Sequence, residues 1–240
     1  MLLLTHNNLQ EVDKLKKIGI LMLDTKFPRI KGDIGNDETF SFPTVKKIVT
    51  GADTTKVVDL GDRGLLNSFI AAARELESSG VSAITTSCGF LAKFQKELAD
   101  SVDIPVFTSS LIQAKYIEPM LKRDQSVGIL TIKKSSLTDE HFKGVGIENI
   151  DKVIYSMEGT SFEKTFMDEE IEYDKDRLQQ DILEVATKMV NENPNVGAII
   201  CECTNMPPFS KAIADKLNIP VFDIVTLTNY IYSSLNKPSF

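Results

Sequence analysis

Two cysteines occupy equivalent positions in an internal repeat of this chain. Residues 81–107 align without a gap with residues 196–222, and 12 of the 27 aligned positions are identical. Cys88 and Cys203 form one of the identical pairs. A duplicated fold that presents one thiol from each half suggests a single site with two facing thiols. A thiol in such a site can exchange protons with a substrate once it is partly ionised.

Two facing thiols could remove a proton from one face of a carbon and deliver another to the opposite face. Racemisation and epimerisation need this arrangement, with one group as thiolate and the other as thiol. Such acid/base groups each contribute on the order of 10²–10⁴-fold, and N–H groups around a substrate carboxylate would stabilise the carbanion. A lone buried cysteine is commonly an inert core residue, but matched positions in two copies favour the functional interpretation.

Short apolar runs alternate with longer helical patterns around these cysteines. The runs are continuous and rich in Val and Ile, which is typical of strands buried on both faces. We predict strands at 18–23, 56–60, 83–86, 104–107, 127–132, 152–155, 198–201 and 219–222. We predict helices at 65–77, 91–101, 178–192 and 209–217. This alternation indicates parallel sheets with right-handed crossovers.

The repeat extends beyond the cysteine segments, since residues 17–21 resemble residues 126–130. Two repeats of this length indicate two related lobes rather than a solenoid. We therefore expect an α/β fold of two pseudo-symmetric lobes, each a parallel four-stranded sheet flanked by helices, with the active site in the cleft between them. The first lobe is predicted to comprise residues 1–110 and 224–240, and the second residues 111–223.

Each cysteine follows a predicted strand and precedes a helix. Ligands of α/β proteins bind outside the carboxyl ends of the strands, and a helix that starts there offers free N–H groups to an anion. The positive end of the helix dipole also lowers the pKa of a nearby thiol. We therefore expect carboxylate binding and an activated sulfur in one place.

The Gly- and Pro-rich segment 24–43 is either a binding loop or an irregular surface excursion.

Composition narrows the class of protein. A net charge of −7 with no basic block argues against nucleic-acid binding. The three leucines near the start are too few for a signal peptide or a membrane span. Three cysteines fit a reducing compartment, so we expect a cytoplasmic protein. Cys201 and Cys203 form a Cys-x-Cys pair, but only His6 and His141 could join them, so we predict no metal site and a structural Cys201.

These residues resemble the aspartate/glutamate racemase superfamily, which includes amino-acid and hydantoin racemases, maleate isomerase and arylmalonate decarboxylase. The resemblance covers nearly the whole chain from about residue 18. Cys203-Thr204 is similar to the Cys-Thr that opens the second catalytic turn of glutamate and aspartate racemases. Asp24-Thr25 resembles the Asp-Ser after their first strand, and Thr131 the hydroxyl-bearing turn that opens their second lobe.

The resemblance implies cofactor-independent proton transfer, a small carboxylate-bearing substrate such as an amino acid, and a homodimer. It makes Cys88 and Cys203 the acid/base pair. The candidate substrate-binding residues are Asp24, Thr25, Arg29, Thr86, Ser87, Gly89, Thr131, Ser135, Thr204 and Asn205.

The chain departs from the amino-acid racemases beside both cysteines. Gly89-Phe90 follows Cys88 where those enzymes have Asn-Thr, and Asn205 replaces the His of glutamate racemases. Arg29 lies in a loop that does not match them, and its guanidinium could bind a substrate carboxylate bidentately. We predict a racemase or epimerase, thus an isomerase, acting at a carbon α to a carboxylate. The alternatives are a decarboxylase, lyase or cis–trans isomerase of the same superfamily, or a non-catalytic small-molecule binding protein.

Overall fold

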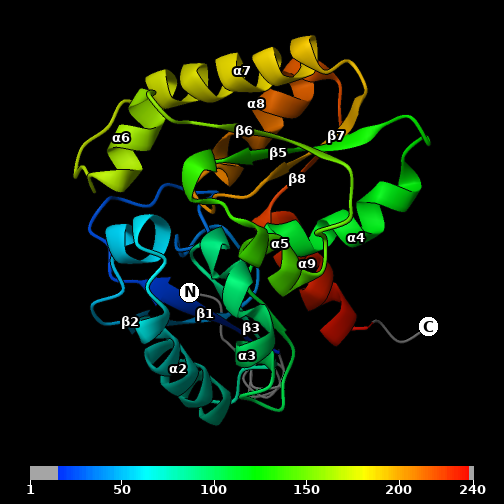
Figure 1. Cartoon of the computed structure of the whole chain (residues 1–240). Helices are drawn as coiled ribbons and strands as arrows, with labels where there is room; N and C mark the ends of the chain where they lie inside the picture. The colour runs from blue at the N-terminus through cyan, green and yellow to red at the C-terminus, as the bar shows by residue number, and fades with distance from the viewer. Residues whose placement is uncertain (1–15, 238–240) are drawn as a thin grey trace, which may run out of the picture.

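The computed structural model describes residues 16–237 and consists of two α/β lobes, one above the other in Figure 1. Each lobe contains a parallel four-stranded sheet, with strand orders β2-β1-β3-β4 and β6-β5-β7-β8. This confirms the predicted fold. The strands are β1 (Ile18–Leu23), β2 (Thr44–Val49), β3 (Ala83–Thr86), β4 (Val106–Phe107), β5 (Ser126–Thr131), β6 (Lys152–Ser156), β7 (Val196–Cys201) and β8 (Val221–Phe222).

The two sheets have the same topology, as the internal repeat predicts. β1 and β5 lie at equivalent inner positions, and every residue of both strands is buried. Each is paired on both sides and covered on both faces, which explains the continuous apolar runs. β3 and β7 are equivalent inner strands, and the cysteine segments follow them.

Helices cover both sheets, as in other parallel α/β folds. The predicted helices at 65–77, 178–192 and 209–217 correspond to α2, α7 and α8, and the one at 91–101 is divided between η3 and α3. The α-helices are α2 (Leu66–Ser78), α3 (Gln95–Ala99), α4 (Ala114–Ile117), α5 (Asp139–Val145), α6 (Ser161–Met167), α7 (Lys175–Glu192), α8 (Pro207–Leu217) and α9 (Ile224–Leu235). Shorter 3-10 turns are η2 (Arg63–Leu65), η3 (Gly89–Phe94), η4 (Ser110–Gln113), η5 (Glu118–Met120) and η6 (Lys134–Ser136).

The strand predicted at 56–60 is wrong. These residues form the π-helix η1 (Thr55–Asp59), whose Val57 and Val58 are buried. The second strand is instead β2, at the sheet edge, where Lys46 and Lys47 are only partly buried. An edge strand needs no continuous apolar run, and a short apolar run does not distinguish a strand from a buried helical turn.

The last helix, α9, packs against the first sheet although it follows the second lobe in sequence. Ile224 and Leu227 belong to the same apolar cluster as Ile18, Ile20 and Phe107. The lobe boundaries at residues 110 and 224 stay a prediction, and the predicted first lobe includes residues 1–15 and 238–240, which lie outside the described residues. Within residues 16–237, no helix is long and apolar enough to cross a membrane.

Candidate active site

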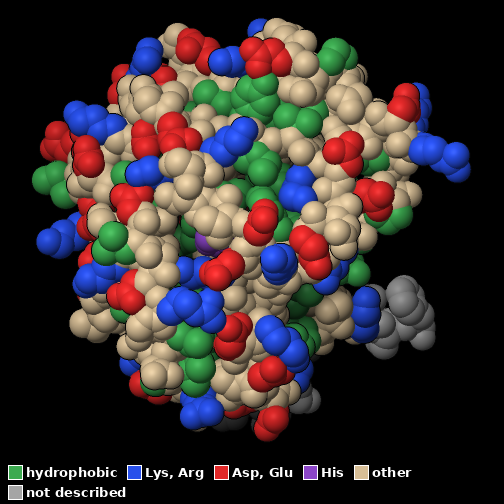
Figure 2. Space-filling model, viewed as in Figure 1, with side chains coloured by type: hydrophobic (Ala, Val, Ile, Leu, Met, Phe, Trp, Pro, Cys, Tyr) green, Lys and Arg blue, Asp and Glu red, His purple; other side chains and the backbone are tan. Residues whose placement is uncertain are grey.

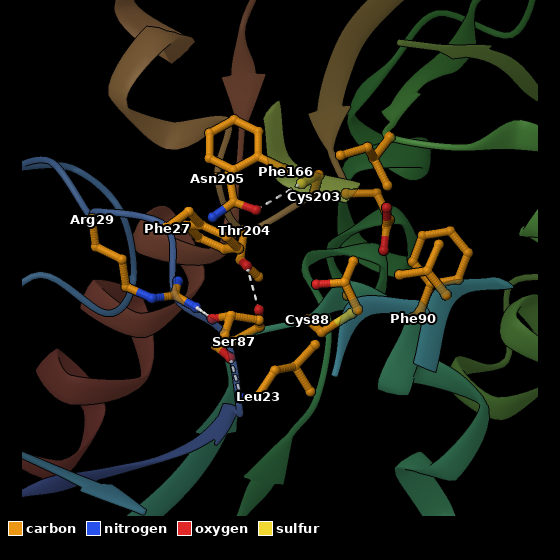
Figure 3. A pocket seen from close by; sticks show the side chains of 16 residues that line it. Leu23, Phe27, Arg29, Ser87, Cys88, Phe90, Phe166, Cys203, Thr204 and Asn205 are labelled. Carbon is orange, nitrogen blue, oxygen red and sulfur yellow. Dashed lines mark hydrogen bonds between the residues drawn. The ribbon is translucent and has the colours of Figure 1, made fainter. Parts of the chain in front are cut away.

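A pocket lies between the two lobes, at the carboxyl ends of β1, β3 and β7 (Figure 3). Its volume is about 380 Å³ when the solvent-filled space at its mouth is included. The lining combines predicted site residues with residues that the sequence analysis missed. The predicted ones are Thr25, Arg29, Ser87, Cys88, Gly89, Cys203, Thr204 and Asn205, and the missed ones are Leu23, Phe27, Thr54, Val58, Phe90, Ile132, Phe166 and Glu202.

The two cysteines of the repeat enter this pocket from different lobes. Cys88 lies two residues beyond the end of β3, and Cys203 lies two residues beyond the end of β7. Their exposed fractions are 8% and 7%, so each thiol is almost enclosed. Figure 3 shows one below and the other above the central space. The fold therefore brings both predicted thiols to one cavity.

The thiols are not activated as the sequence analysis expected. Burial is the largest cause in each case, and it raises the pKa of Cys88 to about 12 and the pKa of Cys203 well above its ordinary value. The charge of Glu202 raises both further. Amide hydrogen bonds from the following turns lower both, but desolvation of the thiolate outweighs them. At neutral pH the free pocket therefore holds two thiols.

The surroundings of the two thiols differ in charge. Lys93 and Arg29 lower the pKa of Cys88, whereas Cys88 and Asp33 raise that of Cys203. Positive charge favours the thiolate and negative charge disfavours it. Cys88 is therefore the thiol that ionises more readily, although the sequence repeat suggests two equivalent groups.

Arg29 is held in place by three contacts on the first lobe. Nη1 donates to Oδ1 of Asp33 at 2.8 Å, and Nη2 donates to Oγ1 of Thr25 at 3.0 Å. The guanidinium carbon lies 4.7 Å from the centroid of the Phe27 ring. A guanidinium has five N–H donors, so this arrangement fixes its orientation and leaves donors for a carboxylate in the pocket.

Asp33, which the sequence analysis missed, joins the two lobes. It is 2% exposed, and its Oδ2 accepts a hydrogen bond of 2.7 Å from Nδ2 of Asn205. Its other oxygen receives Arg29 and the N–H of Gly35. The only sequence signal was its spacing four residues after Arg29 in segment 24–43. Part of segment 24–43 therefore lines the pocket, and its role as a binding loop stays a prediction.

Glu202 is a buried carboxyl group that the sequence analysis also missed. It is completely buried, and its Oε2 accepts a 2.8 Å hydrogen bond from Oγ1 of Thr131. Oε1 has no hydrogen-bond partner among the described residues. A Cβ at Gly89 would lie 2.1 Å from this oxygen, so position 89 has room only for glycine. Burial raises the pKa of Glu202 to about 7.

Three predicted hydroxyl groups form hydrogen bonds that hold the cysteine turns. Oγ1 of Thr204 donates to the carbonyl oxygen of Ser87 at 2.6 Å, across the lobe boundary. Oγ of Ser87 accepts from the N–H of Leu23 at 2.8 Å. Thr86 is fully buried behind the pocket and donates to the carbonyl oxygen of Thr108. These residues position the cysteine turns.

Thr86 and Thr131 do not line the pocket, and two other predicted residues also lie outside its lining. Asp24 is exposed and accepts a hydrogen bond from the N–H of Gly51. Ser135 is exposed and donates to Oε1 of Glu158.

Three buried phenylalanines complete the walls. Phe27 and Phe166 make an edge-to-face contact with centroids 5.1 Å apart, on the side where Arg29 lies. Phe90 lies on the other side in Figure 3 and contacts His141 edge-to-face. From sequence alone, such residues cannot be distinguished from core. Among residues 16–237, no group of three or more His, Cys, Asp or Glu is placed to hold a metal ion.

Further contacts join the two lobes, mostly at residues adjacent in sequence to ones that line the pocket. Nζ of Lys133 lies 2.6 Å from Oδ1 of Asp59, and the hydroxyl of Tyr173 donates to the carbonyl oxygen of Pro28 at 3.0 Å. Basic and acidic side chains are mixed over the face of the molecule in Figure 2. The pocket is a small site between the lobes that is partly open to solvent.

Replacing Glu202 with glutamine should change how stability depends on pH. The folded protein holds the Glu202 proton up to about pH 7, whereas an ordinary glutamate releases it near 4.5. Wild-type stability therefore falls as the pH rises through this window, by about 2–3 kcal/mol between pH 5 and pH 8. The variant should lack this fall. Urea denaturation at both pH values measures it, with Glu184→Gln on the exposed face of α7 as control; equal pH dependence in wild type and Glu202→Gln would contradict the assignment.

Comparisons with known proteins give a family and a set of relatives. A family model described as Asp/Glu/Hydantoin racemase matches residues 49–228. A dimethylsulfoniopropionate lyase of Durusdinium sp. clade D is 29% identical over 238 residues, covering 95% of this chain and 78% of that protein. Dimethylsulfoniopropionate lyase 5 of Emiliania huxleyi (strain CCMP1516) is 26% identical over 238 residues, covering 93% of this chain but 46% of that protein. The chain thus spans less than half of this second relative.

Solved structures share the two-lobed fold. An aspartate racemase of Picrophilus torridus superposes with a TM-score of 0.60 at 16% identity, covering 92% of this chain and 94% of that one. Unliganded arylmalonate decarboxylase superposes with a TM-score of 0.60 at 12% identity, covering 94% of each chain. At these identities the likeness shows the fold alone.

Proposed function

The chain belongs to the Asp/Glu/hydantoin racemase family, and from this premise we propose that it is a lyase that eliminates a sulfide from a β-sulfonio carboxylate. The substrate that we propose is dimethylsulfoniopropionate. The observation that carries the proposal is the similarity to dimethylsulfoniopropionate lyases along 95% and 93% of the chain. This favours the lyase alternative of the sequence analysis over the racemase.

The proposed reaction needs one base and a carboxylate anchor. The base removes a proton from the carbon α to the carboxylate, and the electron pair of that C–H bond becomes the new C=C bond. The bond between the β carbon and sulfur breaks, and its electrons leave with dimethyl sulfide. Acrylate remains, and the proton stays on the base until solvent takes it. Because the departing sulfide is neutral, no second acid is needed.

We assign the base to Cys88. Lys93 and Arg29 favour its thiolate, and the sulfonium charge of a bound substrate would favour it further. Arg29 would bind the substrate carboxylate and stabilise the charge that develops on it when the α proton leaves. Cys203 would stay a thiol in the opposite wall, because Asp33, Glu202 and the Cys88 thiolate all disfavour its ionisation.

Racemisation is the second candidate, and the matched Cys88 and Cys203 favour it. A two-base racemase needs both sulfurs to exchange roles, whereas their unequal electrostatic surroundings suit a reaction in one direction.

The direct test is to incubate the purified chain with dimethylsulfoniopropionate and to quantify dimethyl sulfide in the headspace by gas chromatography. The proposal predicts enzyme-dependent release with one acrylate for each sulfide. Absence of sulfide from a folded protein, with α-deuterium incorporation into amino acids in D₂O, would instead support the racemase.

A further inference from the structure

We propose that Glu202 and Phe90 form a subsite for a positively charged onium group, so that the pocket selects zwitterions with an anionic and a cationic end. This inference rests on the proposed function, which it extends by naming what recognises the leaving group. Neither residue was a candidate in the sequence analysis.

Among residues 16–237, the Glu202 carboxyl group has no cationic partner. A buried carboxylate is normally paired, because burial without compensation costs several kcal/mol (roughly 2–7 for a polar group, more for a charge). The single hydrogen bond of the Glu202 carboxyl group, from Thr131, leaves Oε1 without a partner among the described residues. The free oxygen belongs to a residue that lines the pocket, so a cationic ligand would supply the missing charge.

The two ends of the pocket carry different polar groups. Figure 3 shows Arg29 and Phe90 on opposite sides, with Cys88 and Cys203 between them. Glu202 lies on the Phe90 side, since its Oε1 would be overlapped by a Cβ at Gly89, the residue before Phe90. A substrate whose carboxylate meets Arg29 would therefore extend its other end past the cysteines toward Glu202. The free N–H donors of Arg29 at one end and the Glu202 carboxyl group at the other are complementary to a zwitterion.

Onium groups are bound differently from protonated amines. A sulfonium or quaternary ammonium carries its charge on methyl-covered atoms and has no N–H to donate, so aromatic rings and carboxylates bind it better than hydrogen-bond acceptors alone. Phe90 is 1% exposed, and it supplies such a ring to the lining of the same pocket as Glu202.

Occupation of this subsite would also prepare the base. Glu202 raises the pKa of both cysteines in the free pocket. An onium group beside the Glu202 carboxylate would offset its negative charge and so lower the pKa of Cys88. A carboxylate of the same shape with an uncharged tail would leave both thiols protonated. The pairing of the onium group with Glu202 would then both select the substrate and activate the base.

Equilibrium binding of a matched ligand pair tests the subsite apart from catalysis. 3-(Trimethylammonio)propanoate and 4,4-dimethylpentanoate have the same shape and differ in the charge of one atom. Isothermal titration calorimetry should show that wild type binds the trimethylammonio ligand about tenfold or more tightly than its uncharged-tail analogue, the tert-butyl ligand. In Glu202→Gln this ratio should fall several-fold toward one, because the ammonium ligand loses the carboxylate and keeps only the Phe90 ring, while the tert-butyl ligand is unaffected.

Two further measurements keep the test decisive. Glu184→Gln on the exposed face of α7 should keep the wild-type ratio. In wild type the ratio should rise between pH 5 and pH 8, as Glu202 loses its proton near pH 7. The two thiols titrate well above this range, and His141 behind Phe90 titrates near 4. This pH series applies even if Glu202→Gln fails to fold.

The outcomes separate this inference from the proposed function. A ratio that is unchanged in folded Glu202→Gln, or that is flat with pH in wild type, would overturn the subsite even if dimethylsulfoniopropionate is cleaved. A ratio that collapses in the variant while wild type releases no sulfide would support the subsite and refute the lyase.

Discussion

Replacing Cys88 with serine is expected to lower kcat/KM for dimethylsulfoniopropionate by about 10²–10⁴-fold, the contribution usual for a general base. A serine hydroxyl fills nearly the same space, so the variant should fold, but its pKa is far too high for it to serve as the base. Cys203→Ser should lose less, because in our assignment this residue stays protonated. Initial rates of sulfide release at saturating and subsaturating substrate measure both effects.

Cys201 provides the matched control for these variants. It is a fully buried thiol two residues before Cys203, it lies outside the pocket lining, and it lies close to Oγ of Ser210. Cys201→Ser should therefore keep wild-type kinetics within a few-fold. A larger loss in Cys203→Ser than in Cys88→Ser would contradict the assignment of the base, and near-wild-type rates in both variants would refute thiol chemistry in this pocket.

Replacing Arg29 with glutamine is expected to impair both binding and folding stability. A charge-assisted bidentate contact with a carboxylate contributes about 1.5–3 kcal/mol, so kcat/KM should fall on the order of 10–10²-fold from this loss alone. The variant also leaves the buried Asp33 carboxylate without its cation, at an expected cost of about 3 kcal/mol in the free energy of unfolding. Steady-state kinetics and urea denaturation measure the two effects.

The double variant Arg29→Gln/Asp33→Asn separates the two effects. Removing both charges should recover most of the lost stability, because no uncompensated charge remains buried, whereas the catalytic loss should persist. Arg29→Lys keeps the charge but cannot reproduce the planar fork, and it should give an intermediate rate. Recovery of both stability and activity in the double variant would show that Arg29 serves only to neutralise Asp33.

The sequence predicted the fold and the meeting of the two cysteines because both depend on patterns along the chain. Strands buried on both faces, such as β1 and β5, appear as unbroken apolar runs, and the repeat places Cys88 and Cys203 at equivalent turns. β2 was missed because an edge strand with two lysines has no such run.

The electrostatics of the site could not be predicted in the same way. The turn geometry suggested acidic thiols, but the pKa of a thiol depends on how much water the other lobe excludes, and no local pattern contains that information. Glu202 and Asp33 were overlooked because a glutamate after a strand or an aspartate in a loop is usually solvated. Their burial follows from contacts made across the lobe boundary, with Gly89 and Asn205.

The most direct test of the proposed lyase is a proton NMR time course in D₂O, with dimethylsulfoniopropionate and an amino acid such as aspartate in the same tube. Vinyl signals of acrylate should appear as the sulfonium methyl signal declines, while the α-proton signal of the amino acid keeps its intensity. Loss of that α-proton signal to deuterium while dimethylsulfoniopropionate remains intact would contradict the account and identify the chain as a racemase.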